Sequence, residues 1–252
     1  MSGSDEIAPR GAKGAALKAA LPKRFYKDVT VKDEEGGGGS LLLDGKPMRT
    51  PGKAAFTLPV RALAEAVASE WRAQGESIDP STMPLTRLAN SAIDGVAGRE
   101  QAVIDDIARH AASDLLCYRA EGPNALVEAQ SAHWDPVLAF ARHELKAPLV
   151  LSECVVHVVQ PQASLARIRD EFEGLDPFSL AALHVMTALT GSALLTLAVL
   201  RGKFTPEQAW QAAHVDEDFQ ISQWGEDAEA KTRRKNRWRD FAAAAKLLDA
   251  VR

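Results

Sequence analysis

The segment over residues 177–200 constrains the fold most, because it runs for twenty-four residues without a formally charged side chain. A stretch of that length is long enough to form a transmembrane helix. It carries hydroxyl and imidazole groups, however, and an isolated membrane helix would leave these groups in lipid without partners. A helix that is apolar all round is also typical of the centre of a globular bundle. We therefore predict a buried core helix over 178–201 and no membrane insertion. The interrupting polar residues are Ser179, His184, Thr187, Thr190, Ser192 and Thr196.

The charge balance excludes proteins that depend on an overall positive charge. The 252 residues include 30 Lys and Arg against 34 Asp and Glu, a net charge of −4, so the chain lacks the long-range attraction of a basic protein to nucleic acid. With 46% hydrophobic residues it can bury a large core. Its two cysteines, Cys117 and Cys154, do not form a CxxC pair, which predicts buried small side chains in a reducing compartment.

Two regions differ in the period of their apolar residues. Residues 24–58 show short alternating runs that enter a turn at Asp44-Gly45, which predicts a small antiparallel β-domain. Residues 59–252 show helical periodicity, which predicts a larger helical domain packed like an orthogonal bundle. Residues 1–23 contain no apolar targeting segment and are expected to form a flexible N-terminal arm. The predicted fold class is therefore α+β.

The helical region divides into several segments. The first helix is expected to begin at Pro59 and to end at Gly75. Pro136 must either kink its helix or restart it. Residues 149–159 are rich in β-branched side chains and fit either a strand or an extended connector. Further helices are predicted over 83–96, 99–113, 124–145, 164–172, 178–201 and 205–248, the last one broken near Trp224-Gly225.

Neither the glycine run nor the histidines indicate a cofactor or metal site. Gly45-Lys46 is followed by Pro47 and does not fit the phosphate-binding loop pattern, so residues 36–39 with Ser40 are predicted to form a flexible hairpin loop in solvent. No two histidines have the HxxxH or HExxH spacing of a metal site. We therefore expect no cofactor and no metal. The histidines are His110, His133, His143, His157, His184 and His214.

A basic run over 231–239 holds six cationic residues and Trp238, a composition that suits binding of single-stranded nucleic acid. Asp227 and Glu229 each stand four residues before a cation, the spacing of ion pairs along a helix. The run is therefore interpreted as a solvated charged helix, and no nucleic-acid partner is expected.

Three consecutive carboxylates, Asp216, Glu217 and Asp218, precede the aromatic motif FQISQWG. Like charges this close do not stabilise a helix, and the sequence shows no evident partner for them. Presentation to another molecule and a solvated acidic turn are both open interpretations. A third hypothesis, a helical enzyme using these carboxylates, requires a buried pocket in which one of them has a raised pKa.

Five separated segments of the chain together resemble one protein family. In order and spacing they are similar to the assembly chaperones of the F-type ATP synthase that act on the alpha subunit of the catalytic head. The resemblance extends from about residue 23 to residue 230. The segments are KRFYKDVTV, LDGKPMRTPGKAAFTLP, LAEAVASEWRAQGESIDPSTMPLTRLANSAID, DLLCYRAEGPNALVEAQSAHWDPVLAFA and DEDFQISQWGEDAEA.

The resemblance implies a chaperone rather than an enzyme, with a small N-terminal β-domain and a helical domain. Such a protein binds the unassembled alpha subunit and shields its interface until the beta subunit takes its place. Where mitochondrial members tend to carry a His-Asp pair after the Trp-Gly motif, this chain has Lys231-Thr232. The lack of a transit peptide indicates a bacterial protein of the cytoplasm, and the alternative is a mitochondrial matrix protein after processing.

The resemblance also directs attention to the carboxylates ahead of the aromatic motif. It places a functionally important carboxylate at Asp216, with Glu217 as the adjacent alternative. We expect both to contact or orient the client together with Phe219, while Trp224 contacts the client and anchors their helix. Two further tryptophans, Trp71 and Trp134, are expected to be structural anchors. The free protein is expected to be a monomer.

Overall fold

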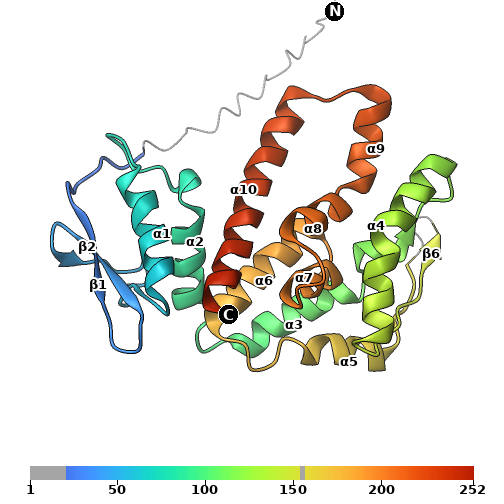
Figure 1. The fold of residues 1–252 in the computed structure, drawn as a ribbon, viewed down its shortest axis with the longest axis horizontal. Helices are drawn as coiled ribbons and strands as arrows, with labels where there is room; N and C mark the ends of the chain where they lie inside the picture. Colours follow the sequence, from blue (N-terminus) through green and yellow to red (C-terminus); the bar gives the residue numbers. More distant parts are fainter. Residues whose placement is uncertain (1–20, 154–156) are drawn as a thin grey trace, which may run out of the picture.

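The computed structural model describes residues 21–153 and 157–252. The chain forms an elongated molecule with a small sheet at one end and helices over the rest of its length (Figure 1). This arrangement confirms the predicted α+β class. Most of the predicted N-terminal arm, up to residue 20, lies outside the described residues, and so does Cys154.

The sheet has four short antiparallel strands around β2 (Gly39–Leu43). On one side β2 pairs with β1 (Val29–Asp33), and on the other with β3 (Lys46–Pro47) and β4 (Thr57–Leu58). The predicted turn at Asp44-Gly45 joins β2 to β3, and both residues have positive φ angles, 49° and 76°. Such angles are required in a two-residue hairpin turn and explain the Asp-Gly sequence.

The glycine run is only partly the predicted solvent loop. Gly36 and Gly37 have φ angles of 85° and 88° and form the turn between β1 and β2. Gly39 instead belongs to β2, where a Cβ atom would stand 2.8 Å from the Cβ of Ala64. The prediction of a flexible loop is therefore wrong for Gly39 and Ser40, because both belong to β2, and at Gly39 the sheet and the first helix approach each other too closely for a side chain.

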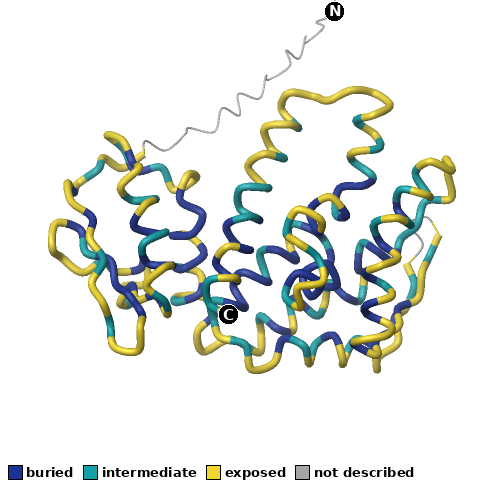
Figure 2. Tube along the Cα trace, viewed as in Figure 1, coloured by how far each residue is buried: buried dark blue, intermediate teal, exposed yellow. Residues whose placement is uncertain are grey.

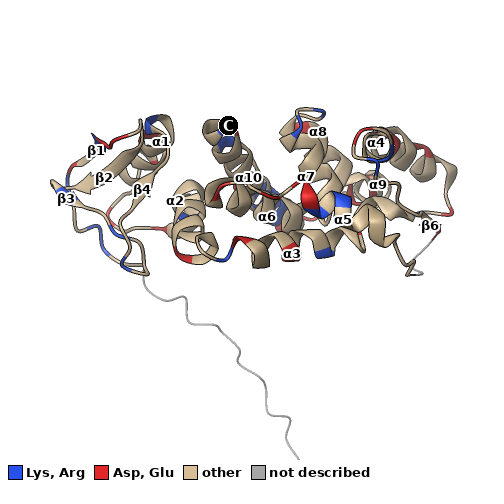
Figure 3. Cartoon of the chain, turned by 90° about the horizontal axis from the view of Figure 1, so that it is seen from below, with Lys and Arg blue, Asp and Glu red and all other residues tan. Residues whose placement is uncertain are grey.

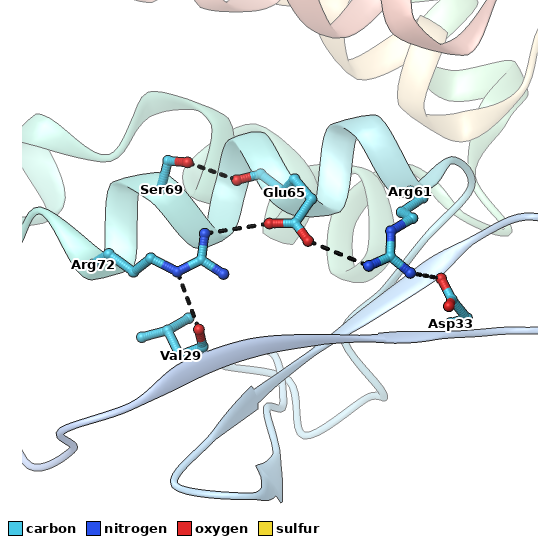
Figure 4. Close-up of polar contacts among 6 residues, drawn as sticks. All are labelled: Val29, Asp33, Arg61, Glu65, Ser69 and Arg72. Carbon is cyan, nitrogen blue, oxygen red and sulfur yellow. Dashed lines mark hydrogen bonds and ion pairs between the residues drawn. The ribbon is translucent and has the colours of Figure 1, made fainter.

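The first helix, α1 (Arg61–Arg72), packs against this sheet. Arg61 pairs with Asp33 at one end of β1, and Arg72 donates from Nε to the Val29 carbonyl at the other end, at 3.1 Å (Figure 4). Glu65 lies between the two arginines, 3.6 Å from Arg61 and 3.2 Å from Arg72. Because α1 shares a core with the sheet, the two predicted domains are in contact here. The predicted boundary between the β-domain and the helical domain, at residues 58 and 59, stays a prediction.

Glu70 of α1 holds the beginning of α2 (Pro84–Asn90). Its carboxylate accepts hydrogen bonds from the backbone N–H groups of Leu85 and Thr86, both at 2.8 Å, and from the Thr86 hydroxyl at 2.7 Å. Burial raises the pKa of Glu70, and these hydrogen bonds oppose the rise. A short turn, η1 (Pro80–Thr82), precedes α2, which continues into the wider π-helical turn η2 (Ser91–Val96).

The uncharged segment 177–200 is buried at the centre, but it forms two helices rather than the one predicted. The first, α6 (Pro177–Thr190), ends at Gly191, whose φ of 67° is left-handed. The second, α7 (Ala193–Leu200), begins with the Ser192 hydroxyl accepting from the backbone N–H of Leu195. Within the described residues, no helix is long and apolar enough to cross a membrane. The pair packs against α3 (Glu100–Ala111) and α10 (Ala228–Val251).

Asp114 lies just after the end of α3 and binds the chain at the break between α6 and α7. It is fully buried and accepts from the backbone N–H of Leu116 at 3.2 Å and of Leu194 at 3.1 Å. One carboxylate therefore caps both η3 (Leu115–Cys117) and α7. Desolvation raises the pKa of Asp114 to about 6. The neighbouring thiol of Cys117 is also buried, and burial raises its pKa to about 12, as the prediction of a buried small side chain requires.

The far end of the molecule contains α4 (Asn124–His143), which continues through Pro136 without restarting. Beyond it, the described part of segment 149–159, residues 149–153 and 157–159, contains one short strand and no helix. This strand, β6 (Ser152–Glu153), pairs in parallel with β5 (Tyr118–Arg119), and α5 (Gln162–Asp170) follows. The predicted helix 205–248 is three helices, α8 (Pro206–Ala213), α9 (Val215–Trp224) and α10. The break at Gly225 is confirmed, and the break at His214 is missed by the prediction.

The buried carboxylate of Asp114 predicts a specific dependence of stability on pH. Its pKa is raised in the folded protein from an ordinary value of 3.8 to about 6, so between these values the folded state keeps a proton that the unfolded state has lost. The group therefore lowers the free energy of unfolding as pH rises, by about 3 kcal/mol in total between pH 4 and pH 7.

Chemical denaturation of the wild type and of Asp114→Asn across this range tests the effect. The difference between the two free energies of unfolding is expected to change in favour of the variant as pH rises, because the amide does not titrate. Parallel curves for the two proteins would contradict the assignment.

Candidate functional site

Helix α9 and the beginning of α10 form a hairpin that stands out from the body of the protein (Figure 1). The hairpin loop at Gly225 is exposed, and exposure decreases along both helices toward the body (Figure 2). At its base α9 packs against α4. This hairpin carries the four residues that the sequence analysis assigned to client binding.

Asp216 points toward α4 and not only toward solvent. The Gln130 side chain, 2% exposed, donates from Nε2 to Asp216 Oδ1 at 2.7 Å. Its Oε1 accepts from the backbone N–H of Ala120 at 2.9 Å. Because that bond fixes the orientation of the amide, only its NH₂ group faces α9, and an acceptor such as a carboxylate fits there. Asp216 therefore ties the first turn of α9 to α4.

Trp134 lies on α4 one helical turn beyond Gln130, and it holds the end of α8, the helix that precedes α9. Its side chain is 1% exposed, and its Nε1 donates to the carbonyl of Ala212, in the last turn of α8, at 2.7 Å. The Arg119 guanidinium lies 5.2 Å from the Trp134 ring centroid and donates to Asp135 at 2.6 Å. The Trp134 contact thus joins α4 to the end of α8, the helix directly before α9.

Glu217 and Asp218 have different surroundings. Asp218 pairs with Arg234 of α10. Glu217 lies 3.9 Å from Nε2 of His214, but burial lowers the pKa of this histidine, and its Nδ1 donates to the Trp210 carbonyl at 2.7 Å. The ring is therefore uncharged at neutral pH, and the contact is not an ion pair. Among the described residues, Glu217 has no hydrogen-bond partner.

The three carboxylates consequently do not form one acidic face. Successive residues of an α-helix point about 100° apart: Asp216 contacts Gln130 of α4, Asp218 pairs with Arg234 of α10, and the partly exposed Glu217 side chain pairs with neither helix. The acidic side chains in the first turn also suit the positive end of the helix dipole. Two of the three carboxylates hold α9 in place, and one remains available.

The aromatic residues of α9 also differ in exposure. Phe219 is half-buried and lines a shallow hollow of about 340 Å³ together with Ala129 and His133 of α4. Trp224, at the end of α9, is 80% exposed. The expectation that Trp224 anchors the helix by packing is therefore wrong. Its indole is instead the most exposed large hydrophobic side chain in the described part of the chain.

The basic run 231–239 lies on the first half of α10 and is largely neutralised. The predicted helical pairing is only partly correct, because Asp227 caps α10 by accepting from the backbone N–H of Ala230 at 2.8 Å. Trp238 packs against Trp210, with ring centroids 5.4 Å apart. The run is thus a charged helix face with its aromatic side turned inward. Its ion pairs are Lys231–Glu226, Arg233–Glu229, Arg234–Asp218 and Arg239–Asp240.

The described residues, 21–153 and 157–252, contain no assembled metal site. No group of three or more His, Cys, Asp or Glu side chains there could hold a metal ion. The carboxylates whose pKa is raised, Glu70 and Asp114, lie away from α9 and accept hydrogen bonds at the beginnings of helices.

Comparison with known proteins decides the family. A family model described as the ATP12 chaperone protein matches residues 23–142. The crystal structure of Atp12 from Paracoccus denitrificans matches with a TM-score of 0.83 and 43% sequence identity, over 92% of this chain and 99% of that one. This chain belongs to the ATP12 chaperone family. Members of this family are ATP synthase assembly chaperones and not enzymes.

Two further proteins similar to this chain come from a bacterium and a eukaryote. The crystal structure of the Atu1473 protein from Agrobacterium tumefaciens has a TM-score of 0.87 and 51% identity, over 92% of this chain and 87% of that one. The mitochondrial protein atp12 of Schizosaccharomyces pombe is 25% identical over 220 residues, which are 82% of this chain and 75% of that protein. The helical hairpin described above thus belongs to a chaperone fold.

Gln130 is the residue of this region that sequence reasoning missed. It stands four residues before Trp134, so both lie on the buried face of α4. A polar residue at a core position of an amphipathic helix is the signal that could have found it, because such a group needs a buried partner. The distance along the chain to Asp216 hid the identity of that partner.

Replacement of Gln130 is expected to loosen α9. Gln130→Leu leaves the Ala120 N–H without its acceptor and Asp216 without its donor, and we expect it to lower the free energy of unfolding by about 1–3 kcal/mol. Hydrogen exchange of the α9 amides should become faster than in the wild type, while exchange of the α6 amides should not change. The matched control is Glu128→Leu, an exposed position on the same helix. Unchanged exchange in α9 would show that this contact does not position the helix.

Proposed function

We propose that this ATP12-family chaperone binds the unassembled alpha subunit of the ATP synthase catalytic head and shields its subunit interface until the beta subunit takes its place. The resemblance of the chain to the alpha-specific chaperones supports this client. The observation that carries the proposal is the 80% exposed indole of Trp224 at the end of α9.

An exposed tryptophan on a fixed helix suits a transient contact with a protein surface. Tryptophan is enriched among the residues that contribute most to protein–protein binding, because it buries a large area with little loss of side-chain entropy. The contacts of α9 with α4 and α10 pre-organise it, so less free energy is spent on ordering when the client binds. A chaperone also has to release its client, and a small apolar contact beside polar residues can be displaced.

The four assigned residues have separable roles in this proposal. Asp216 orients α9 through Gln130. Glu217 and Trp224 contact the client directly, since the side chain of neither residue forms a hydrogen bond with the described residues. Phe219 contributes the wall of the hollow against α4, where an apolar side chain of the client fits. Trp71 and Trp134 support the scaffold.

The setting of the chaperone is part of the proposal. Its relatives come from bacteria and from a mitochondrion, and we place this chain in the bacterial cytoplasm, with the mitochondrial matrix as the alternative. The free protein is monomeric, so that its client-binding surface is open before the alpha subunit arrives.

Substitutions on the exposed side of α9 test the client surface. Trp224→Ala and Glu217→Lys are each expected to weaken binding of purified alpha subunit by about tenfold or more, as for residues at the centre of an interface. Because both side chains are at least partly exposed, the melting temperature should stay within a few degrees of the wild type. Isothermal titration calorimetry measures the affinity and circular dichroism the melting temperature.

Two controls separate the site from general effects. Val159→Ala removes another exposed apolar side chain, 76% exposed, and Asp249→Lys makes the same kind of charge change at the far end of α10. Both should bind like the wild type. Capture of another ATP synthase subunit in place of alpha by the wild type would overturn the client assignment, and full binding by Trp224→Ala would overturn the site.

A further inference from the structure

A second surface with unpartnered groups lies at the sheet end of the molecule, away from α9 (Figure 1). There the chain forms a hollow of about 290 Å³, which we name the Phe25 pocket. It lies between the segment before β1, strand β3 and the end of α1. Its lining includes Phe25, Lys46, Met48, Arg49 and Trp71.

One wall of the Phe25 pocket is aromatic and held rigidly. Phe25 is 71% exposed, and its ring meets that of Tyr26 edge-on at 5.4 Å. Tyr26 is buried, donates from its hydroxyl to the Trp71 carbonyl at 2.7 Å, and packs on the Trp71 ring at 5.4 Å. An exposed phenylalanine fixed against the buried Tyr26 and the half-buried Trp71 is an apolar contact surface without a partner in the described chain.

The rim of the Phe25 pocket is cationic. Lys46 and Arg49 form no ion pair with any described residue, unlike most cations of the basic run on α10. Arg49 donates to the Lys53 carbonyl at 2.9 Å, which fixes the guanidinium in the segment after β3. Lysines and arginines also occupy the loops around β3 (Figure 3). Clustered exposed cations attract a negatively charged partner and orient it.

Asp44 is the one carboxylate that lines this pocket, and it is engaged with the backbone. Its Oδ1 accepts from the N–H groups of Lys27 at 2.9 Å and Asp28 at 2.8 Å. These hydrogen bonds lower the pKa of Asp44. The carboxylate therefore braces the turn and leaves the two rim cations available to a ligand.

The size of the Phe25 pocket selects among ligands. A hollow of about 290 Å³ is at the lower limit of cofactor and drug-sized sites, about 300–1,000 Å³, and has room for one or two side chains of a peptide. A hydrophobic side chain fits against Phe25, Met48 and Trp71, while neighbouring carboxylates pair with Lys46 and Arg49. We propose that the Phe25 pocket is a second client-contact site, which binds an acidic segment of the client carrying one large apolar side chain.

This proposal rests on the proposed function only for the source of the segment. Two contacts at opposite ends of the molecule would hold one client more tightly than either contact alone, because the second forms within a complex already made. Each contact could also be displaced in turn as the client enters its final assembly.

A synthetic peptide tests the pocket without the client. The probe is a ten-residue peptide of Asp, Glu and Ser with one central Phe, titrated into the full-length ¹⁵N-labelled protein. The readout is the indole N–H signal of Trp71, assigned by its loss in Trp71→Phe. This signal is expected to shift with the acidic peptide, and not with a peptide in which Lys replaces the acidic residues or Ser replaces Phe. Equal shifts with the Lys peptide, no shift with the acidic peptide, or a larger shift with a single-stranded oligonucleotide would each overturn the proposal.

Binding of purified alpha subunit then distinguishes this proposal from the proposed function. Phe25→Ala and the double variant Lys46→Glu/Arg49→Glu are expected to weaken binding by about tenfold, with a reduced dependence on salt for the double variant. The charge-matched control, Arg99→Glu/Arg167→Glu, changes two exposed cations outside the pocket and should bind normally. Failure of the wild type to bind alpha subunit would contradict the proposed function but leave the peptide result standing. Normal client binding by both pocket variants would overturn the second site.

Discussion

The packing of the helices in this protein depends on the buried carboxylate of Asp114, which stabilises the break between α6 and α7. It caps η3 and α7 at once, so that the long uncharged segment can turn back on itself inside the core. With the turn in place, α6 packs against α3 and α10, and α7 against α4 and α8. A charge buried this deeply is tolerated because its oxygens accept several hydrogen bonds, and its raised pKa reflects the remaining cost of desolvation.

From this core the structure extends a fixed helix into solvent. Gln130 and Arg234 hold Asp216 and Asp218, and Trp134 holds the end of α8 directly before the helix begins. Of the α9 residues only Val215 is buried, and the side chains left without a partner include Glu217 and the indole of Trp224. A chaperone with a rigid, sparsely polar contact can bind with little ordering cost and still be displaced, which suits a protein that must give up its client during assembly.

The two ends of the molecule present different chemistry. The α9 hairpin combines an exposed indole with a free carboxylate, whereas the Phe25 pocket combines an exposed phenyl ring with free cations. Each surface therefore presents one exposed aromatic side chain and charge that forms no ion pair with the described residues. Such a division allows one chaperone to recognise two unlike segments of a client, with charge setting orientation and the aromatic group supplying contact area.

The sequence by itself determined the α+β class, the Asp-Gly turn, the buried position of segment 177–200 and the break at Gly225, because each depends on residues close together in the chain. Only the tertiary structure decided that segment 177–200 forms two helices, since the capping carboxylate of Asp114 comes from about 80 residues earlier. The separate surroundings of Asp216, Glu217 and Asp218 were decided in the same way, by Gln130 and Arg234 on other helices. Local periodicity reports which side of a helix is buried, but the partners of a polar group and the exposure of Trp224 follow from packing between distant segments.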